Sequence, residues 1–112
     1  MFSVIIPLYN KAAYIEKAIN SVLAQNFKEF ELIIVNDGST DDSFSKLTVI
    51  CNRLSVENPE IFNKIKIVQQ ENQGVSTARN NGVKIAKYDY IAFLDADDWW
   101  ESTFLEEMKM PY

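Results

Sequence analysis

Residues 30–35 are Phe-Glu-Leu-Ile-Ile-Val, and Asn-Asp-Gly follows them at positions 36–38. Apolar and mostly β-branched residues run almost without interruption, which is typical of a strand buried on both faces of a parallel sheet. The Asn-Asp-Gly triplet is a turn signal that ends the strand. Residues 2–6, Phe-Ser-Val-Ile-Ile, have the same apolar character and predict a second strand, which Pro7 is expected to end. Two such strands predict a parallel α/β sheet.

Runs with helical periodicity separate the apolar runs. The strands are expected at residues 2–6, 30–35, 65–68 and 90–94. Helices are expected at residues 15–23, from Thr40 as the cap to Leu54, at residues 74–86 and from about Ser102 to Met108. The order βαβαβαβ predicts a three-layer α/β fold with a mainly parallel sheet and right-handed crossovers.

Composition excludes several classes of function. The 112 residues carry 16 acidic and 11 basic side chains, a net charge of −5, so a nucleic-acid partner is not expected. The absence of His excludes His bases, His zinc sites and a Ser-His-Asp triad within the chain. The lone Cys51 predicts a buried core thiol and a reducing compartment. No targeting or membrane-spanning segment is predicted, because the run at residues 2–8 is far shorter than the roughly 20 residues a bilayer requires.

Polar residues follow three of the expected strands. Ligands of an open parallel sheet bind beyond the carboxyl ends of the strands, so residues 7–10, 36–38 and 95–98 are expected to lie together. Asp95, Asp97 and Asp98 would repel one another unless a cation offsets their charge. Oxygen ligands suit Mg²⁺ or Mn²⁺, which share their coordination with substrate phosphates. The pattern therefore predicts a metal-bridged diphosphate ligand.

Each candidate residue has a structural alternative. Asp41-Asp42 suits the start of a helix better than a ligand, and Trp99-Trp100 suits packing better than ligand contact. Arg79 is favoured as a site residue over a solvated charge, because the acidic edge is expected nearby. Tyr9 stays open between a loop aromatic and a platform for a base. Asp98 stays open between a turn residue and a ligand.

Other motifs fail on detail. The first strand is not followed by the Gly-rich turn of a dinucleotide site, and there is no P-loop. An EF-hand starting at Asp37 would need Gly where Asp42 stands and Glu where Thr48 stands. The D-x-D of a haloacid-dehalogenase-type phosphatase would come early in the chain, with Thr or Val where Trp99 stands.

Four ordered blocks carry a resemblance to a known family. They are residues 3–10 (SVIIPLYN), 31–41 (ELIIVNDGSTD), 72–82 (NQGVSTARNNG) and 93–98 (FLDADD). One D-x-D alone is a weak signal, but four blocks in this order and spacing are specific. The chain resembles the N-terminal, nucleotide-sugar-binding portion of the inverting glycosyltransferases of family 2, which have the GT-A fold.

The resemblance implies roles for the matching residues. The loop with Pro7, Tyr9 and Asn10 would cradle the nucleoside, with Tyr9 near the base. Asp37 would accept a hydrogen bond from an N–H on the base edge. Arg79 would support the nucleotide or the acidic loop.

The resemblance also implies a metal and a donor. Asp95, Ala96 and Asp97 would form the D-x-D motif, with Asp95 and Ala96 at the nucleotide sugar, and with Asp95 and Asp97 on Mn²⁺ or Mg²⁺. The donor would be a nucleotide diphosphate sugar, with UDP favoured, and the acceptor a carbohydrate or a lipid-linked hydroxyl, as in polysaccharide synthesis. The catalytic base is expected beyond Tyr112, because Asp98 is a poor substitute.

Residues 1–112 are therefore expected to form a single donor-nucleotide-binding portion of a GT-A domain, without the acceptor half. The parent protein would transfer sugar with inversion, and the isolated chain would be inactive. The alternative is a non-catalytic module that binds a nucleotide diphosphate. The resemblance further implies a cytoplasmic location, extending to the inner face of the membrane. An exposed edge at the fourth strand would favour self-association.

Overall fold

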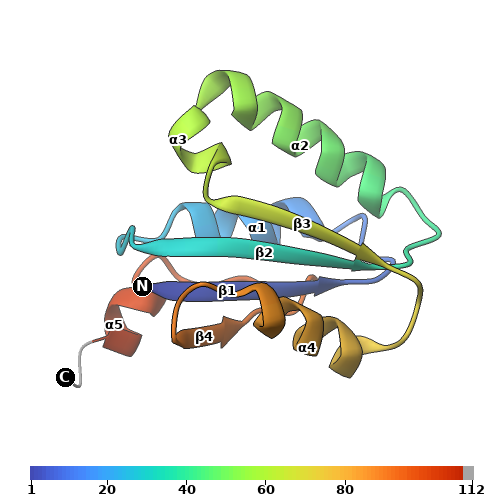
Figure 1. Ribbon diagram of the computed structural model, residues 1–112. Coiled ribbons are helices and arrows are strands. Elements are labelled where there is room, and N and C mark those ends of the chain that lie inside the picture. Colours follow the sequence, from blue (N-terminus) through green and yellow to red (C-terminus); the bar gives the residue numbers. More distant parts are fainter. Residues whose placement is uncertain (110–112) are drawn as a thin grey trace.

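Figure 1 shows the chain as a computed structural model that describes residues 1–109. The strands are β1 (Phe2–Leu8), β2 (Phe30–Asp37), β3 (Ile65–Gln70) and β4 (Tyr90–Phe93). The helices are α1 (Ile15–Leu23), α2 (Ser43–Glu57), α3 (Pro59–Phe62), α4 (Val75–Ile85) and α5 (Phe104–Lys109). The predicted alternation of strands and helices is confirmed. Residues 110–112, the last three of the portion predicted at residues 1–112, lie outside the described residues.

The sheet is parallel throughout and has the order β3-β2-β1-β4. Phe2 at the start of β1 lies opposite Phe30 of β2 on one side and Tyr90 of β4 on the other. The chain therefore adds β2 and β3 on one side of β1 and then returns to place β4 on the other side. This reversal makes the carboxyl ends of β1 and β4 the topological switch point of the sheet.

Helices cover both faces of the sheet, so the predicted three-layer α/β class is confirmed (Figure 1). Alternation along the strands sends every second side chain to the same face. The larger core joins the even-numbered residues of β1 to helices α1, α2 and α5, and it includes the buried Cys51 as expected. The smaller core packs Ile5 and Ile33 against Ala78 of α4. Close approach of α4 depends on Gly82, where a Cβ would lie 2.6 Å from Cγ2 of Ile5.

The first strand runs further than its sequence indicates. The expectation that Pro7 ends it is wrong, because Pro7 lies inside β1 opposite Val35. Ile5 and Pro7 are two residues apart, so their backbone polar groups point to the same side of β1. On that side the carbonyl of Ile5 accepts the N–H of Leu94, which follows β4. The β1–β4 ladder ends where Ile5 faces Phe93, so the N–H that Pro7 lacks would face a side without a paired strand.

Two helix boundaries also differ from expectation. Thr40 does not cap α2, which begins at Ser43. The carboxylate of Asp41 accepts the N–H of Ser43 instead, at 2.9 Å, and this supports the interpretation of Asp41 as a helix-start residue. Helix α2 extends to Glu57, beyond the expected end at Leu54, and Asn58 then begins the one-turn helix α3, where its side chain accepts the N–H of Ile61.

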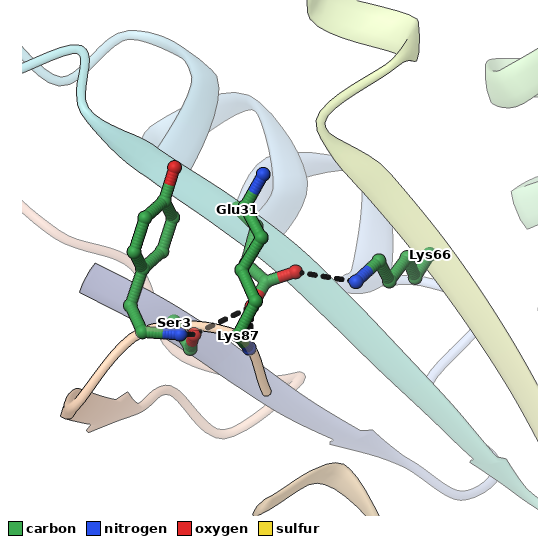
Figure 2. Close-up of polar contacts among 5 residues, drawn as sticks. Ser3, Glu31, Lys66 and Lys87 are labelled. Atoms are coloured by element: carbon green, nitrogen blue, oxygen red, sulfur yellow. Dashed lines mark hydrogen bonds and ion pairs between the residues drawn. The ribbon is translucent and has the colours of Figure 1, made fainter. Parts of the chain in front are cut away.

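A buried carboxylate joins the strands at the end opposite their carboxyl termini. Glu31 of β2 is only 2% exposed, and its Oε2 accepts from the Ser3 hydroxyl and the backbone N–H of Lys87, both at 2.6 Å. Lys66 of β3 approaches Oε1 at 2.9 Å. Figure 2 shows the three groups converging on the carboxylate from β1, β3 and the segment after α4. One side chain thereby connects β1, β2, β3 and the approach to β4.

The surroundings of Glu31 favour its charged form. Burial alone would raise the pKa of the Glu31 carboxyl, but hydrogen bonds from the Ser3 hydroxyl, the Lys87 N–H and the Lys66 ammonium outweigh it and hold the pKa below the ordinary glutamate value. Because the pKa is lowered in the folded state, the stabilisation is present above the unfolded-state pKa and is lost as the pH falls through the folded-state pKa.

No helix among residues 1–109 combines the length and apolar character needed to cross a membrane.

We predict that Glu31→Gln destabilises the chain by about 1–3 kcal/mol at pH 7, because buried donors lose a charged acceptor. The free energy of unfolding of the wild type should also fall more steeply than that of the variant as the pH drops below about 4.3, the ordinary glutamate pKa. Urea titrations of both proteins between pH 7 and pH 3 measure this. Parallel pH profiles would contradict the assignment.

Candidate functional site

A cavity of about 530 Å³ lies at the carboxyl ends of β1, β2 and β4, at the switch point of the sheet. Its lining comes from the carboxyl ends of β1 and β2, from the loops that follow β1, β3 and β4, and from the first turns of α4. The lining residues are Pro7, Leu8, Tyr9, Lys11, Asp37, Asn72, Gly74, Val75, Arg79, Asp95, Ala96 and Asp97. The loops meet here because parallel strands all present their carboxyl ends to the same edge of the sheet.

Most of the site residues predicted from the sequence line this one cavity. They are Pro7, Tyr9, Asp37, Arg79, Asp95, Ala96 and Asp97. Tyr9 lines the cavity and is 43% exposed, so part of the residue is accessible to a ligand. The binding roles assigned to these residues by resemblance stay predictions.

Asn10 is absent from the lining. Its Oδ1 accepts the backbone N–H groups of Thr40 and Asp41, at 2.8 and 3.2 Å, and its backbone N–H donates to the Ser39 hydroxyl. Its φ of 51° is left-handed, a conformation that Asn tolerates better than most residues. Asn10 therefore ties the loop after β1 to the loop after β2, and a direct contact with a ligand stays a prediction.

Asp37 ends β2 and is almost fully buried. Its Oδ1 accepts from the backbone N–H of Gln73 and the side-chain amide of Gln70, both at 2.8 Å. Its Oδ2 accepts from the backbone N–H of Gly74 at 3.1 Å, with the Asn72 amide at 3.4 Å. The carboxylate thus organises residues 72–74, which supply two walls of the cavity.

Two basic side chains form ion pairs with the acidic loop after β4. Nη2 of Arg79 lies 3.0 Å from Oδ1 of Asp95, and Nζ of Lys11 lies 3.4 Å from Oδ2 of Asp97. The carboxylate of Asp98 instead accepts its neighbour's backbone N–H, from Trp99. Among residues 1–109, no cluster of three or more Asp, Glu, Cys or His side chains is arranged to hold a metal ion.

Asp95 and Asp97 are nevertheless suited to a divalent cation. Both carboxylates are about half exposed and line the cavity, so their oxygens are accessible from it. Mg²⁺ and Mn²⁺ commonly take one or two protein carboxylates and complete their coordination with phosphate oxygens and water. Asp95 and Asp97, two carboxylates beside an open cavity, fit that pattern. A site in which protein ligands alone surround the metal would not fit it.

Arg79 keeps donor capacity beyond its ion pair. Its guanidinium lies over the ring of Phe93, 5.6 Å from the centroid, which fixes the plane of the group. Its Nε is buried and has no hydrogen-bond partner within the described part of the chain. A buried donor without a partner is costly, so an acceptor brought into the cavity would gain from it.

Sequence reasoning did not assign Lys11, Asn72, Gly74 and Val75 to the site. Lys11 follows the loop after β1, and residues 72–75 follow β3, whose carboxyl end meets the same edge. The signal for residues 72–75 was their place in the third of the four sequence blocks. Gly38 lets them approach: its φ is +67°, and a Cβ there would lie 2.6 Å from the backbone nitrogen of Asn72.

The two tryptophans lie outside the cavity lining. The ring of Trp100 stacks on Phe104, with centroids 4.3 Å apart, and packs against the larger core, so the packing interpretation is confirmed for it. Trp99 is half exposed, and the ammonium of Lys17 lies 4.7 Å from its ring centroid.

Comparison with known proteins identifies the family. Residues 3–111 match the family model described as "Glycosyl transferase family 2". The chain belongs to glycosyl transferase family 2. Family 2 relatives include the glycosyltransferase GlyA of Streptococcus pneumoniae, 39% identical over 95% of this chain and 14% of its own length. The putative glycosyltransferase EpsH of Bacillus subtilis is 37% identical over 95% of this chain and 28% of its own length.

Solved structures of glycosyltransferases share the fold, which confirms the GT-A class. S. aureus TarS 1–349 in complex with UDP is 32% identical with a TM-score of 0.79, over 96% of this chain and 30% of that one. The mannosyltransferase PcManGT from Pyrobaculum calidifontis, in complex with GDP-Man and Mn²⁺, is 26% identical with a TM-score of 0.80, over 93% and 30% of the two chains. The chain thus spans about a third or less of these family 2 proteins.

We predict that Asp37→Ala frees the 72–74 segment, because the backbone N–H groups of Gln73 and Gly74 lose their acceptor. Hydrogen exchange of these two amides should speed up roughly tenfold, equivalent to about 1.4 kcal/mol. Asp42→Ala is the matched control: Asp42 is an exposed carboxylate near the same edge, outside the cavity lining. Equal exchange in both variants would disprove the organising role of Asp37.

Proposed function

We propose that residues 1–112 form the donor-nucleotide-binding portion of an inverting glycosyltransferase, with a nucleotide diphosphate sugar, UDP-sugar above all, as donor. One observation carries the proposal: a cavity at the switch point of a parallel sheet combines an aromatic platform, a buried carboxylate and a D-x-D pair. UDP in TarS and GDP-Man in PcManGT lend support, since both proteins share this fold.

Each part of the donor has a matching group in this cavity. The ring of Tyr9 offers a face for the base, while Pro7 and the buried Ala96 shape the walls. Asp37 lines the cavity, and its carboxylate would accept a base N–H in addition to the donors it already holds. Arg79 offers its unpaired Nε and its charge to phosphate oxygens.

Asp95 and Asp97 are the residues proposed to hold Mn²⁺ or Mg²⁺. When bound, the metal would offset the negative charge of the departing diphosphate. The chain's own contribution is to place two carboxylates beside the cavity and to keep two cations, Lys11 and Arg79, within reach of the same volume.

Transfer itself requires a base that deprotonates the acceptor hydroxyl. We propose that this base and the acceptor site lie in sequence beyond Tyr112, since the relatives are about three or more times longer than this chain. The acceptor would be a carbohydrate or a lipid-linked hydroxyl, in polysaccharide synthesis. A non-catalytic module that binds a nucleotide diphosphate is the alternative, and it is favoured if no added sequence restores transfer.

We also propose that the protein is cytoplasmic and works at the inner face of the membrane. The lone buried Cys51 supports a reducing compartment, because the chain uses no disulfide.

We predict that the chain binds UDP more tightly with Mn²⁺ than with EDTA, and that Asp97→Asn abolishes this difference while retaining binding in EDTA. We expect Asp97→Asn to lower the affinity for UDP in Mn²⁺ roughly tenfold or more, because the variant lacks one of the two carboxylates proposed to bind the metal. Calorimetric titration measures it.

Asp42→Asn serves as the control in these titrations. It removes one acidic charge from an exposed position outside the cavity and should behave as the wild type. A metal effect that persists in Asp97→Asn would remove this residue from the metal site.

We also predict that Tyr9→Ala weakens UDP binding by about 1–3 kcal/mol, the usual value of base–aromatic stacking. Tyr9→Phe keeps the ring and should bind within about twofold of the wild type if stacking dominates. If both variants bind as tightly as the wild type, Tyr9 does not support the base.

The edge of the sheet at β4 supports a proposal of self-association. In the described sheet β4 pairs with β1 on one side and forms the edge on the other. Its side chains of Tyr90 and Phe93 are about half exposed. Light scattering should show a mass that rises with concentration, and Tyr90→Lys should suppress the rise, because an edge charge opposes strand addition. A monomer at all concentrations would refute this.

A further inference from the structure

Lys11 is held in place by its backbone. Its N–H donates to the hydroxyl of Ser43 at 2.9 Å, and Ser43 is fully buried at the start of α2. Its carbonyl accepts the N–H groups of Tyr14 and Ile15, both at 3.0 Å, at the start of α1. The Cα of Lys11 is thus fixed by the beginnings of two helices, whereas its side chain is 42% exposed.

The side chain of Lys11 extends to the opposite wall of the cavity. Its ammonium lies 3.4 Å from Oδ2 of Asp97, and the two side chains are 42% and 47% exposed. The contact joins the loop after β1 to the loop after β4 at the cavity wall. An exposed pair at this distance is weak, and another ion can displace it at little cost.

The charges of the two ion pairs at the acidic loop balance. Asp95 and Asp97 contribute −2, and Arg79 and Lys11 contribute +2, so the four groups sum to zero. A divalent cation on the two carboxylates leaves the two basic side chains without their partners. A diphosphate entering the same cavity then supplies the negative charge that they require.

We propose that Lys11 is a positioning residue that exchanges partners: its ammonium occupies Asp97 until a divalent cation takes that carboxylate, and it then pairs with the diphosphate of the donor. The inference rests on the proposed function and adds a specific consequence. Lys11 competes with the metal when the metal is alone, and it assists the nucleotide. It therefore couples the binding of metal and nucleotide, so that neither occupies the site well alone.

Arg79 is less suited to this exchange. Its guanidinium lies over the Phe93 ring and is closer to its carboxylate, at 3.0 Å. A lysine ammonium on a flexible stem moves between acceptors more freely than a planar group packed on a ring. Lys11 is the movable cation of the pair.

The test uses the 112-residue chain, its Lys11→Met variant and the control Lys84→Met. Lys84 is an exposed residue of α4 outside the cavity lining, so the control removes the same charge without touching Asp97. Electron paramagnetic resonance measures the binding of Mn²⁺ without nucleotide. Calorimetry measures the binding of UDP in saturating Mn²⁺.

We expect Lys11→Met to bind Mn²⁺ alone roughly two- to fivefold more tightly than the wild type, and UDP in saturating Mn²⁺ more weakly by a similar factor, as suits an exposed pair. Lys11→Arg should bind Mn²⁺ as the wild type does, and Lys84→Met should match the wild type in both assays. The tighter Mn²⁺ binding should shrink at 1 M salt, because the pair is screened.

The outcomes separate the two proposals. If the wild type binds UDP with Mn²⁺ but Lys11→Met leaves the affinity for Mn²⁺ alone unchanged or lower, the partner exchange is wrong while the proposed function stands. The same holds if Lys84→Met reproduces the effect of Lys11→Met, because a general loss of charge would then explain it. If the wild type binds neither UDP nor Mn²⁺, the proposed function fails first, and the role of Lys11 fails with it.

Discussion

The double pairing of β1 is the constraint on which the site depends. This strand is buried along its whole length and is hydrogen-bonded to β2 on one side and β4 on the other. Because both neighbours are parallel to it, their carboxyl ends come to the same edge. The loop after β1 therefore lies between the NDG turn of β2 and the acidic loop of β4. Any change in the register of β1 would separate Tyr9 from Asp37 and Asp95, which line the same cavity.

Carboxylates have different roles at the two ends of this sheet. Glu31 is buried, and three donors satisfy it from three segments of the chain, so it serves the fold (Figure 2). Asp95 and Asp97 are about half exposed, each paired with one basic side chain, so their oxygens remain accessible to a ligand. Asp37 lies between these cases, since it holds residues 72–74 and also lines the cavity. Burial and the number of donors distinguish a structural carboxylate from an available one.

Prediction from the sequence succeeded where a local pattern was enough. Apolar runs gave the strands, and the sequence blocks gave most of the cavity lining. It failed where the answer depended on a distant partner. Pro7 reads as a strand terminator until the end of the ladder with β4 is known. Thr40 reads as a helix cap until Asp41 is seen to accept the N–H of Ser43. The sequence around Asn10 does not show that its side chain accepts the backbone N–H groups of Thr40 and Asp41, about thirty residues further along the chain.

The sequence by itself determined the α/β class, the family and the edge of the sheet at which polar groups gather, because alternating burial and motif spacing are written locally along the chain. Only the tertiary structure decided the strand order β3-β2-β1-β4, the pairing of Glu31 with Lys66, and the meeting of Lys11 with Asp97 across 86 positions of sequence. The physical reason is that an ion pair depends on where two backbones are brought by the packing of the core. That position is a property of the whole sheet and its helices, and no single segment encodes it.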